Sequence, residues 1–285
     1  MGRVMRRAIA YVVVGILSVQ FGAAVAKDLF GRIDPTSMVW LRLLTSALVL
    51  VVLARPVLRG RNRQDWAVVL AFGVSLGLMN WAIYQSFARI PLGLAVTIEF
   101  VGPLAIAVLG SRRVRDLAWV VLAGLGVALL GFDPEGVTAA GVGFALLAGG
   151  AWAAYILLSA GTGRRWPGLD GLAVASVVAT LPLTPYAVHA GGETLLEPEV
   201  LALGAAVGLL SSVIPYSFEL SALRTLRPSV FGILMSLEPA AAALAGLLLL
   251  GEVLTPVQLL AMACVVAASI GATRSGSTIA EPVPD

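Results

Sequence analysis

Two glutamates stand in segments where a charged side chain is costly. Glu99 lies in the apolar run over residues 95–110, and Glu238 lies in the apolar run over residues 233–251. An ionised side chain in the middle of a lipid-like layer costs at least ~2.5 kcal/mol. Such a carboxylate can bind a proton or a substrate ammonium group. The structural alternative is a buried ion pair, or a protonated carboxyl group bonded to nearby backbone.

The two glutamates belong to a repeated pattern. The stretch SFARIPLGLAVTIEFVGPLAIAVLG parallels the later stretch SALRTLRPSVFGILMSLEPAAAALAGLLLLG. Each has a Ser, an Arg, a Pro that opens a helix, a Gly, an apolar run with a glutamate, and then Pro103 or Pro239. The glutamates are 139 residues apart in a chain of 285 residues. The carboxylate therefore appears twice because the helix that carries it appears twice.

A basic residue also lies inside an apolar segment. Arg42 is two helical turns from the end of its segment, at a depth from which it could reach Glu99. Two interpretations stay open. Arg42 could neutralise Glu99 and lock two helices together, or its guanidinium could bind a substrate carboxylate, which it matches with a fork of donors.

Further polar and aromatic residues could line a cavity. Asn80 and Tyr84 in LMNWAIYQS are four residues apart and therefore share one helix face. Such a face should point at protein or at a water-filled cavity, because lipid cannot pair with it. The complete predicted set for substrate and proton binding is Glu99, Glu238, Asn80, Tyr84, Arg42, Gln20, Trp152, Tyr155 and Tyr216.

The elements that carry these residues must span a membrane. Hydrophobic residues make up 59% of the chain, charged residues 12%, and the mean hydropathy is +0.96. Repeated apolar stretches of about 17–25 residues indicate transmembrane helices. We predict an all-α integral membrane protein of ten spans, at residues 8–26, 36–54, 66–88, 91–110, 115–132, 138–160, 170–188, 200–222, 228–250 and 256–272.

The basic residues predict the orientation. With the N-terminus in the cytoplasm, 15 basic residues fall in cytoplasmic segments, and only Lys27, Arg32 and Arg89 lie outside. The asymmetry alternates at every loop, which supports the count of ten spans. We therefore expect a multi-pass protein of the inner or plasma membrane with both termini cytoplasmic.

Five helices per half is an odd number, so the second half should be inverted relative to the first. We expect a first repeat over residues 1–133, a second, inverted repeat over residues 134–273 and a disordered cytoplasmic tail over residues 274–285. Inverted repeats are typical of secondary transporters, which bind their cargo near the midplane between the halves.

The N-terminal stretch also resembles a secretory signal. It has a basic start, an apolar middle and an Ala-x-Ala motif at residues 24–26. Cleavage would leave nine helices and a repeat without its counterpart, so we expect the first helix to be retained. N-terminal sequencing of the mature protein distinguishes the two outcomes.

Motifs of several other protein classes are missing from the sequence. Cys264 is the only cysteine and His189 the only histidine, so a cysteine-based metal site is excluded. A phosphate-binding Gly-rich loop with a lysine is missing, so we expect no ATPase domain in this chain. We expect no enzyme activity, no cofactor, no metal and no nucleic-acid partner.

The paired segments TIEFVGPLA and LMSLEPAAAALAG resemble the EamA-type branch of the drug/metabolite transporter superfamily. RIPLGLAVTIEFVGPLA and SVFGILMSLEPAAAALAGLLLLGE are similar to the threonine/homoserine exporters of that branch, and the resemblance covers residues 8–272. It implies proton-driven export of small amino acids or similar metabolites. It also implies a cavity lined by spans one, three, four, six, eight and nine. Span two, which carries Arg42, is not among the spans that the resemblance places around the cavity.

Our leading hypothesis is therefore a proton-coupled exporter that works by alternating access, with a small amino acid, protons and the lipid bilayer as partners. An exporter of drugs or other metabolites with the same fold is the alternative. Gln20 disfavours a cationic drug, because small multidrug exporters carry a glutamate in the first span. A non-transporting receptor or enzyme is disfavoured by the short loops. The oligomeric state is left open.

Overall fold

The computed structural model describes residues 2–109, 117–130, 136–215 and 228–276, together with the isolated residues 218, 222 and 226. Within these residues the structure is helical and contains no strand. Seven helical segments are long and apolar enough to cross a membrane, and three shorter apolar helices bring the total to the ten predicted spans. The prediction of an all-α membrane protein is confirmed.

The helices follow the predicted spans closely, with boundaries shifted by a few residues. They are α1 (Gly2–Asp28), α2 (Pro35–Ala54), α3 (Arg63–Phe87), α4 (Leu92–Glu99), α5 (Val101–Leu109), α6 (Leu117–Leu129), α7 (Ala139–Gly163), α8 (Asp170–Thr180), α9 (Thr184–Gly191), α10 (Pro198–Gly208), α12 (Pro228–Met235), α13 (Glu238–Ala245) and α14 (Pro256–Gly276). Two π-helical turns, η6 (Leu209–Val213) and η7 (Gly246–Leu250), continue α10 and α13. The predicted tail begins at residue 274, whereas α14 runs to Gly276; residues 277–285 lie outside the described residues.

Local sequence explains where the helices begin. The Asp34 carboxylate accepts a hydrogen bond from the backbone N–H of Thr36 at 2.8 Å, and Pro35 opens α2. Asn62 and Asp65 form a reciprocal capping box at the start of α3. These side chains satisfy N–H groups that have no partner within the helix.

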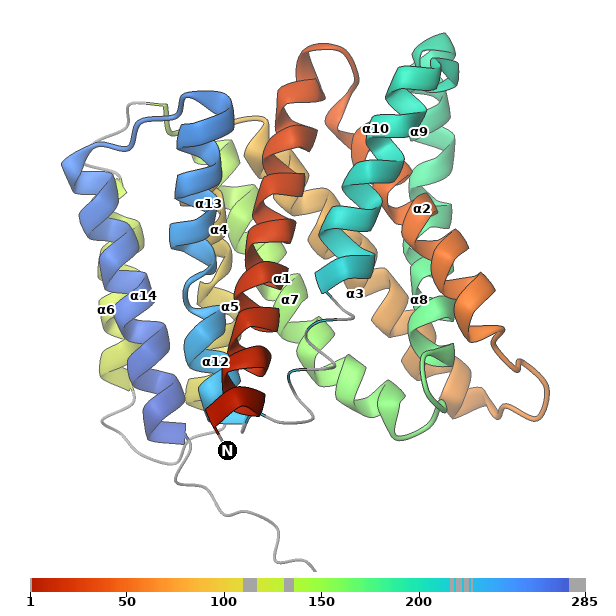
Figure 1. Cartoon of the computed structure of the whole chain (residues 1–285), viewed down its shortest axis with the longest axis horizontal. Helices are drawn as coiled ribbons and strands as arrows, with labels where there is room; N and C mark the ends of the chain where they lie inside the picture. The colour runs from red at the N-terminus through yellow and green to blue at the C-terminus, as the bar shows by residue number, and fades with distance from the viewer. Residues whose placement is uncertain are drawn as a thin grey trace, which may run out of the picture.

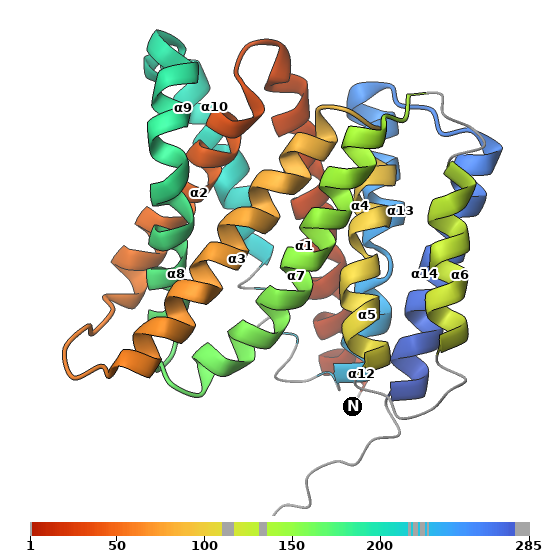
Figure 2. The same ribbon diagram turned by 180° about the vertical axis from the view of Figure 1, so that it is seen from behind.

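The helices stand side by side, with their ends at two opposite faces (Figure 1). In both views α4 and α13 occupy the upper half, where they pack against each other, and α5 and α12 occupy the lower half, where each packs against α14 (Figure 2). The chain therefore runs down through α4 and α5 and up through α12 and α13. The upper pair packs closely, since a Cβ added at Gly93 would lie 2.8 Å from the Cα of Ala243.

The first glutamate-bearing span is interrupted near its middle. Its helix α4 ends at Glu99, and α5 begins at Val101. Pro103 lacks the N–H that would bond to the Glu99 carbonyl four residues earlier, so the helical ladder is broken there. The expected continuous span over residues 91–110 is thus a pair of half-helices.

The second glutamate-bearing span has the same interruption. Its helix α12 ends at Met235, and α13 begins at Glu238. Pro239 cannot donate to the Met235 carbonyl. In both spans the carboxylate therefore sits where one half-helix meets the next.

Helix α7 packs directly on the first interruption. A Cβ added at Gly102 would lie 1.9 Å from the carbonyl oxygen of Gly149, and one added at Gly149 would lie 2.6 Å from the carbonyl oxygen of Glu99. The backbones of α5 and α7 approach so closely that only hydrogen fits between them. This contact fixes the position of the Glu99 break.

We predict that Gly102→Ala destabilises the protein by about 1–3 kcal/mol or more, because its methyl group overlaps the α7 backbone. Gly150→Ala is the matched control, since a Cβ at Gly150 meets nothing within 4 Å. The measurement is the melting temperature of each purified variant in detergent. Equal melting temperatures for the two variants would contradict the close contact.

Candidate functional site

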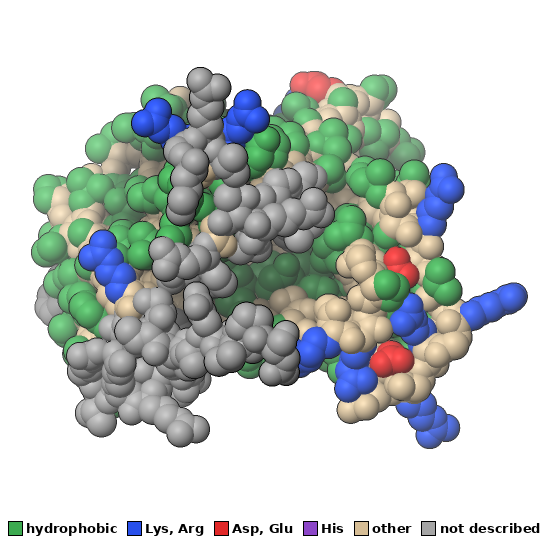
Figure 3. All heavy atoms as spheres, turned by 60° about the horizontal axis from the view of Figure 1, so that its bottom comes forward, with side chains coloured by type: hydrophobic (Ala, Val, Ile, Leu, Met, Phe, Trp, Pro, Cys, Tyr) green, Lys and Arg blue, Asp and Glu red, His purple; other side chains and the backbone are tan. Residues whose placement is uncertain are grey.

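A cavity of about 600 Å³ lies between the two interrupted spans and α1, α2, α3 and α7. Seen from the end where the N-terminus lies, the molecular surface is hollowed, and the floor of the hollow is hydrophobic (Figure 3). Seven of the nine predicted site residues line this cavity. They are Gln20, Arg42, Asn80, Glu99, Trp152, Tyr155 and Glu238.

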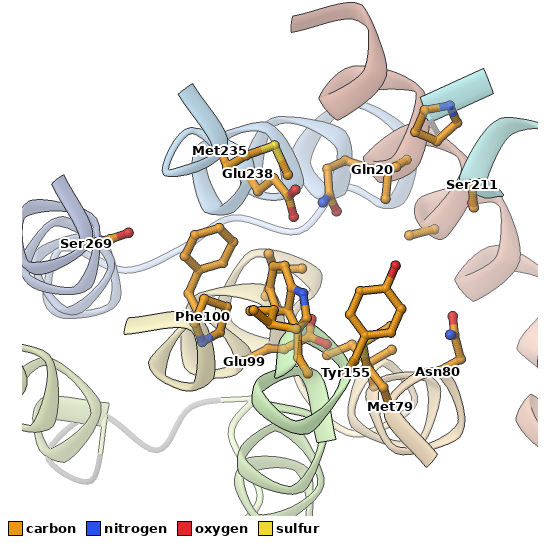
Figure 4. Close-up of a pocket in the computed structure, with 18 of the residues that line it drawn as sticks. Gln20, Met79, Asn80, Glu99, Phe100, Tyr155, Ser211, Met235, Glu238 and Ser269 are labelled. Atoms are coloured by element: carbon orange, nitrogen blue, oxygen red, sulfur yellow. The ribbon is translucent and has the colours of Figure 1, made fainter. Parts of the chain in front are cut away.

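The two glutamates approach the cavity from opposite walls (Figure 4). Each is only 9% exposed, so both carboxyl groups are largely withdrawn from bulk solvent. Within the described residues Glu99 has no ion-pair partner. A carboxylate at the junction of two half-helices, next to open space, can accept a proton or a cationic group from the cavity.

Arg42 reaches the same cavity from α2. A terminal nitrogen of its guanidinium donates to the carbonyl oxygen of Ser211 at 3.1 Å, and its central carbon lies 5.5 Å from the centre of the Tyr84 ring. Among the described residues no direct ion pair joins Arg42 to Glu99, although the two charges interact electrostatically, so both interpretations of Arg42 stay predictions. The expectation that span two contributes nothing to the cavity is wrong, because α2 supplies this guanidinium.

Aromatic side chains form part of the wall. The Trp152 ring meets the Phe100 ring edge to face, with centroids 5.1 Å apart, and the Tyr155 ring packs against Phe72 at 5.1 Å. Asn80 donates to the carbonyl of Leu76 in its own helix at 2.9 Å and lines the cavity from α3. These contacts hold the wall in a fixed shape around the acids.

Tyr84 lies behind this wall. It is fully buried between the rings of Phe30 and Phe87 and does not line the cavity itself. Tyr216, the last of the predicted residues, lies outside the described residues.

Sequence reasoning missed four hydroxyl groups that line the cavity. They belong to Ser159 in α7, to Ser211 in η6, and to Ser269 and Thr273 in α14. The available signal was a hydroxyl residue in an apolar span, but such residues are common in membrane helices because they serve packing. Only the helix arrangement separates those that face the cavity from those that do not.

An ion pair joins distant segments at the end of the molecule opposite the N-terminus. Lys27 Nζ lies 2.5 Å from Glu252 Oε1 and also donates to the carbonyl of Ile90 at 2.7 Å. Glu252 accepts from the backbone N–H of Leu92 at 2.7 Å. The last turn of α1, the start of α4 and the chain after η7 are thereby tied together.

Ten membrane-crossing segments around a polar cavity are typical of membrane transporters. Residues 139–274 match the EamA-like transporter family. The threonine/homoserine exporter RhtA of Escherichia coli strain K12 is 42% identical over 268 residues, which cover 93% of this chain and 90% of the exporter. RhtA of Salmonella typhimurium strain LT2 is 41% identical over 271 residues, with the same coverage of 93% and 90%. The chain therefore belongs to the EamA-like transporter family.

Two more distant proteins are also similar. The uncharacterized transporter YwfM of Bacillus subtilis strain 168 is 30% identical over 221 residues, which cover 72% of this chain and 73% of YwfM. A crystal structure of a chain 19% identical to this one superposes with a TM-score of 0.59 and covers 95% of this chain and 99% of the other. The second likeness shows the shared fold.

We predict that the cavity is reached from the cytoplasm. In a Cys264→Ser background, Thr273→Cys should react with a membrane-impermeant maleimide in inside-out vesicles and remain unlabelled in right-side-out vesicles. Ala268→Cys, at a fully buried position of the same helix, is the unreactive control. Labelling of Thr273→Cys only from the outside would contradict the predicted orientation of the open face.

Proposed function

We propose that this protein exports small amino acids of the threonine/homoserine type across the cell membrane. The observation that carries the proposal is the charge pattern of the cavity. Two carboxylates, Glu99 and Glu238, and one guanidinium, Arg42, line a space of about 600 Å³. That pattern complements a zwitterion, which carries an ammonium group and a carboxylate. The 42% identity to the RhtA exporters over 93% of the chain supports the same cargo.

Proton coupling follows from the chemistry of the glutamates. The ammonium group of the cargo binds to an ionised carboxylate at Glu99 or Glu238. A proton that enters from the outside binds to the same carboxylate and removes the charge that holds the ammonium group. Binding of the proton and binding of the cargo therefore exclude each other, which lets the inward proton gradient drive export.

Alternating access requires that the cavity opens to one side at a time. The hollow on the face near the N-terminus gives one opening (Figure 3). The contact of Lys27 with Glu252 holds α1, α4 and the end of η7 together at the other face. We propose that the two repeats, residues 1–133 and 134–273, rock against each other and that this ion pair breaks when the outer side opens.

The cavity also favours a second candidate cargo. Met79, Met235 and Phe231 line it together with Trp152. Flexible thioethers and aromatic rings adapt to varied apolar shapes. Amphipathic metabolites or drugs are therefore the second candidate, and a flux panel of labelled amino acids, nucleosides and dyes separates the two.

We predict that Glu99→Gln and Glu238→Gln each lower proton-driven threonine flux by about tenfold or more, because a hydrogen bond to a charged group is worth about 1.5–3 kcal/mol. The measurement uses purified protein in liposomes with an imposed pH gradient. Glu193→Gln, an exposed glutamate away from the cavity, is the control and should leave flux unchanged. Unchanged flux in both cavity variants would remove the coupling mechanism.

We predict that the double variant Lys27→Met with Glu252→Gln exposes the cavity to the outside. Removing both charges avoids a buried unpaired charge and loosens the contact between α1 and α4. Ala23→Cys, which lines the cavity from α1, should then react with an impermeant maleimide added outside.

The matched control removes an ion pair that lies in solvent. Arg32→Gln breaks the exposed contact with Glu199, where the nitrogen–oxygen distance is 3.0 Å. Exposed pairs contribute little, so the labelling of Ala23→Cys should not change in this variant. Equal labelling in the control and in the double variant would show that the Lys27 contact does not close the outer side.

A further inference from the structure

Three buried polar atoms on residues that line the cavity have no hydrogen-bond partner in the described part of the chain. They are Gln20 Oε1, Arg42 Nε and the Ser211 hydroxyl. Gln20 and Ser211 are only 2% and 3% exposed, so bulk water does not reach them. Proteins pair nearly all buried polar groups, because an unpaired one keeps its full desolvation cost. We call these three residues the Arg42 cluster.

The cluster is organised around the guanidinium of Arg42. One terminal nitrogen of Arg42 bonds to the Ser211 carbonyl at 3.1 Å, and the guanidinium carbon lies 5.5 Å from the Tyr84 ring centre. Ser211 packs against α1, since a Cβ added at Gly22 would lie 2.4 Å from the Ser211 hydroxyl oxygen. Gln20, Arg42 and Ser211 line the same cavity. Helices α1, α2 and α3 thus meet η6 at this point.

The backbone at Ser211 supports a binding role. Ser211 lies in the π-helical turn η6, which interrupts the regular ladder that α10 begins. Such turns are rare and occur frequently at functional sites, because they redirect a side chain out of the helical pattern. The Ser211 carbonyl accepts from Arg42, and Arg42 has no direct ion-pair partner among the described residues, so the two side chains can bind an anionic ligand.

The chemistry of the three atoms selects the ligand. Arg42 Nε–H and the Ser211 hydroxyl are donors, and the guanidinium carries a positive charge. A planar carboxylate matches this set, because its two oxygens accept several charge-assisted hydrogen bonds. Gln20 Oε1 is an acceptor, and it suits the ammonium or the side-chain hydroxyl group that adjoins that carboxylate.

We propose that the Arg42 cluster binds the α-carboxylate of the transported amino acid, opposite the glutamates that bind its ammonium group. This inference rests on the proposed function and adds how the cargo is oriented. A cargo held at both charged ends must be a zwitterion of fixed length between ammonium and carboxylate. Amines without a carboxylate are therefore poor substrates.

The melting temperature separates a binding role of Ser211 from a structural one. If the Ser211 hydroxyl binds the cargo and does not stabilise the fold, Ser211→Ala should leave the melting temperature of the purified protein unchanged or raise it. A structural role predicts the opposite, a lower melting temperature with unchanged transport kinetics.

The experiment measures the KM of the full-length protein in liposomes for L-threonine and for threoninol, which carries an alcohol in place of the carboxylate. We expect the wild type to prefer threonine. Ser211→Ala should raise the KM for threonine about tenfold and leave the KM for threoninol unchanged. The control is Ser37→Ala, whose buried hydroxyl donates to the Ala187 carbonyl at 2.9 Å away from the cavity. It should lower the melting temperature and leave both KM values unchanged.

Two further results separate this inference from the proposed function. If the wild type does not transport threonine, but lactate raises its melting temperature and Ser211→Ala abolishes that rise, the proposed cargo is wrong and the carboxylate site stands. If the wild type transports threonine and Ser211→Ala keeps the KM for threonine, the export function stands and the carboxylate site is overturned. Equal KM values for threonine and threoninol in the wild type also overturn it.

Discussion

The structure depends on the cost of placing two carboxyl groups inside an apolar layer. Glu99 and Glu238 are each 9% exposed and lie where a proline interrupts a span. A charge at that depth is tolerated only beside a cavity or a partner. Three features meet this need. A proline interrupts each span, a cavity of about 600 Å³ lies next to the carboxyl groups, and a glycine contact packs α7 against the break at Glu99.

The opposite charge in the cavity completes this arrangement. Arg42 is held by a backbone carbonyl and an aromatic ring, neither of which neutralises it. Acids on one side and a guanidinium on the other form an electrostatic pattern that an amino acid zwitterion satisfies at both ends. We propose that selectivity arises from the distance between the two charged ends of the cargo, because a ligand with only one of the two charges leaves one charged group of the cavity without its ligand partner.

The sequence predicted the spans, the fold class and seven residues of the cavity wall, because buried charges and apolar length are readable without a structure. It did not predict that both spans are interrupted at the glutamate, since a proline within a span also fits a simple kink. It left open whether Arg42 locks two helices together or binds a substrate carboxylate, and it missed Ser211. Their positions depend on how α2 and η6 pack against α1, which is a contact between segments far apart in the chain.

We propose that a proton and the cargo compete for a carboxylate at Glu99 or Glu238. The most direct test is the equilibrium Kd of the purified protein for threonine between about pH 5 and about pH 8, with proton release recorded in weak buffer. If they compete, the Kd for threonine should rise as pH falls, by up to about tenfold per pH unit, and threonine binding should release protons. A Kd that does not change with pH, without proton release, would contradict it.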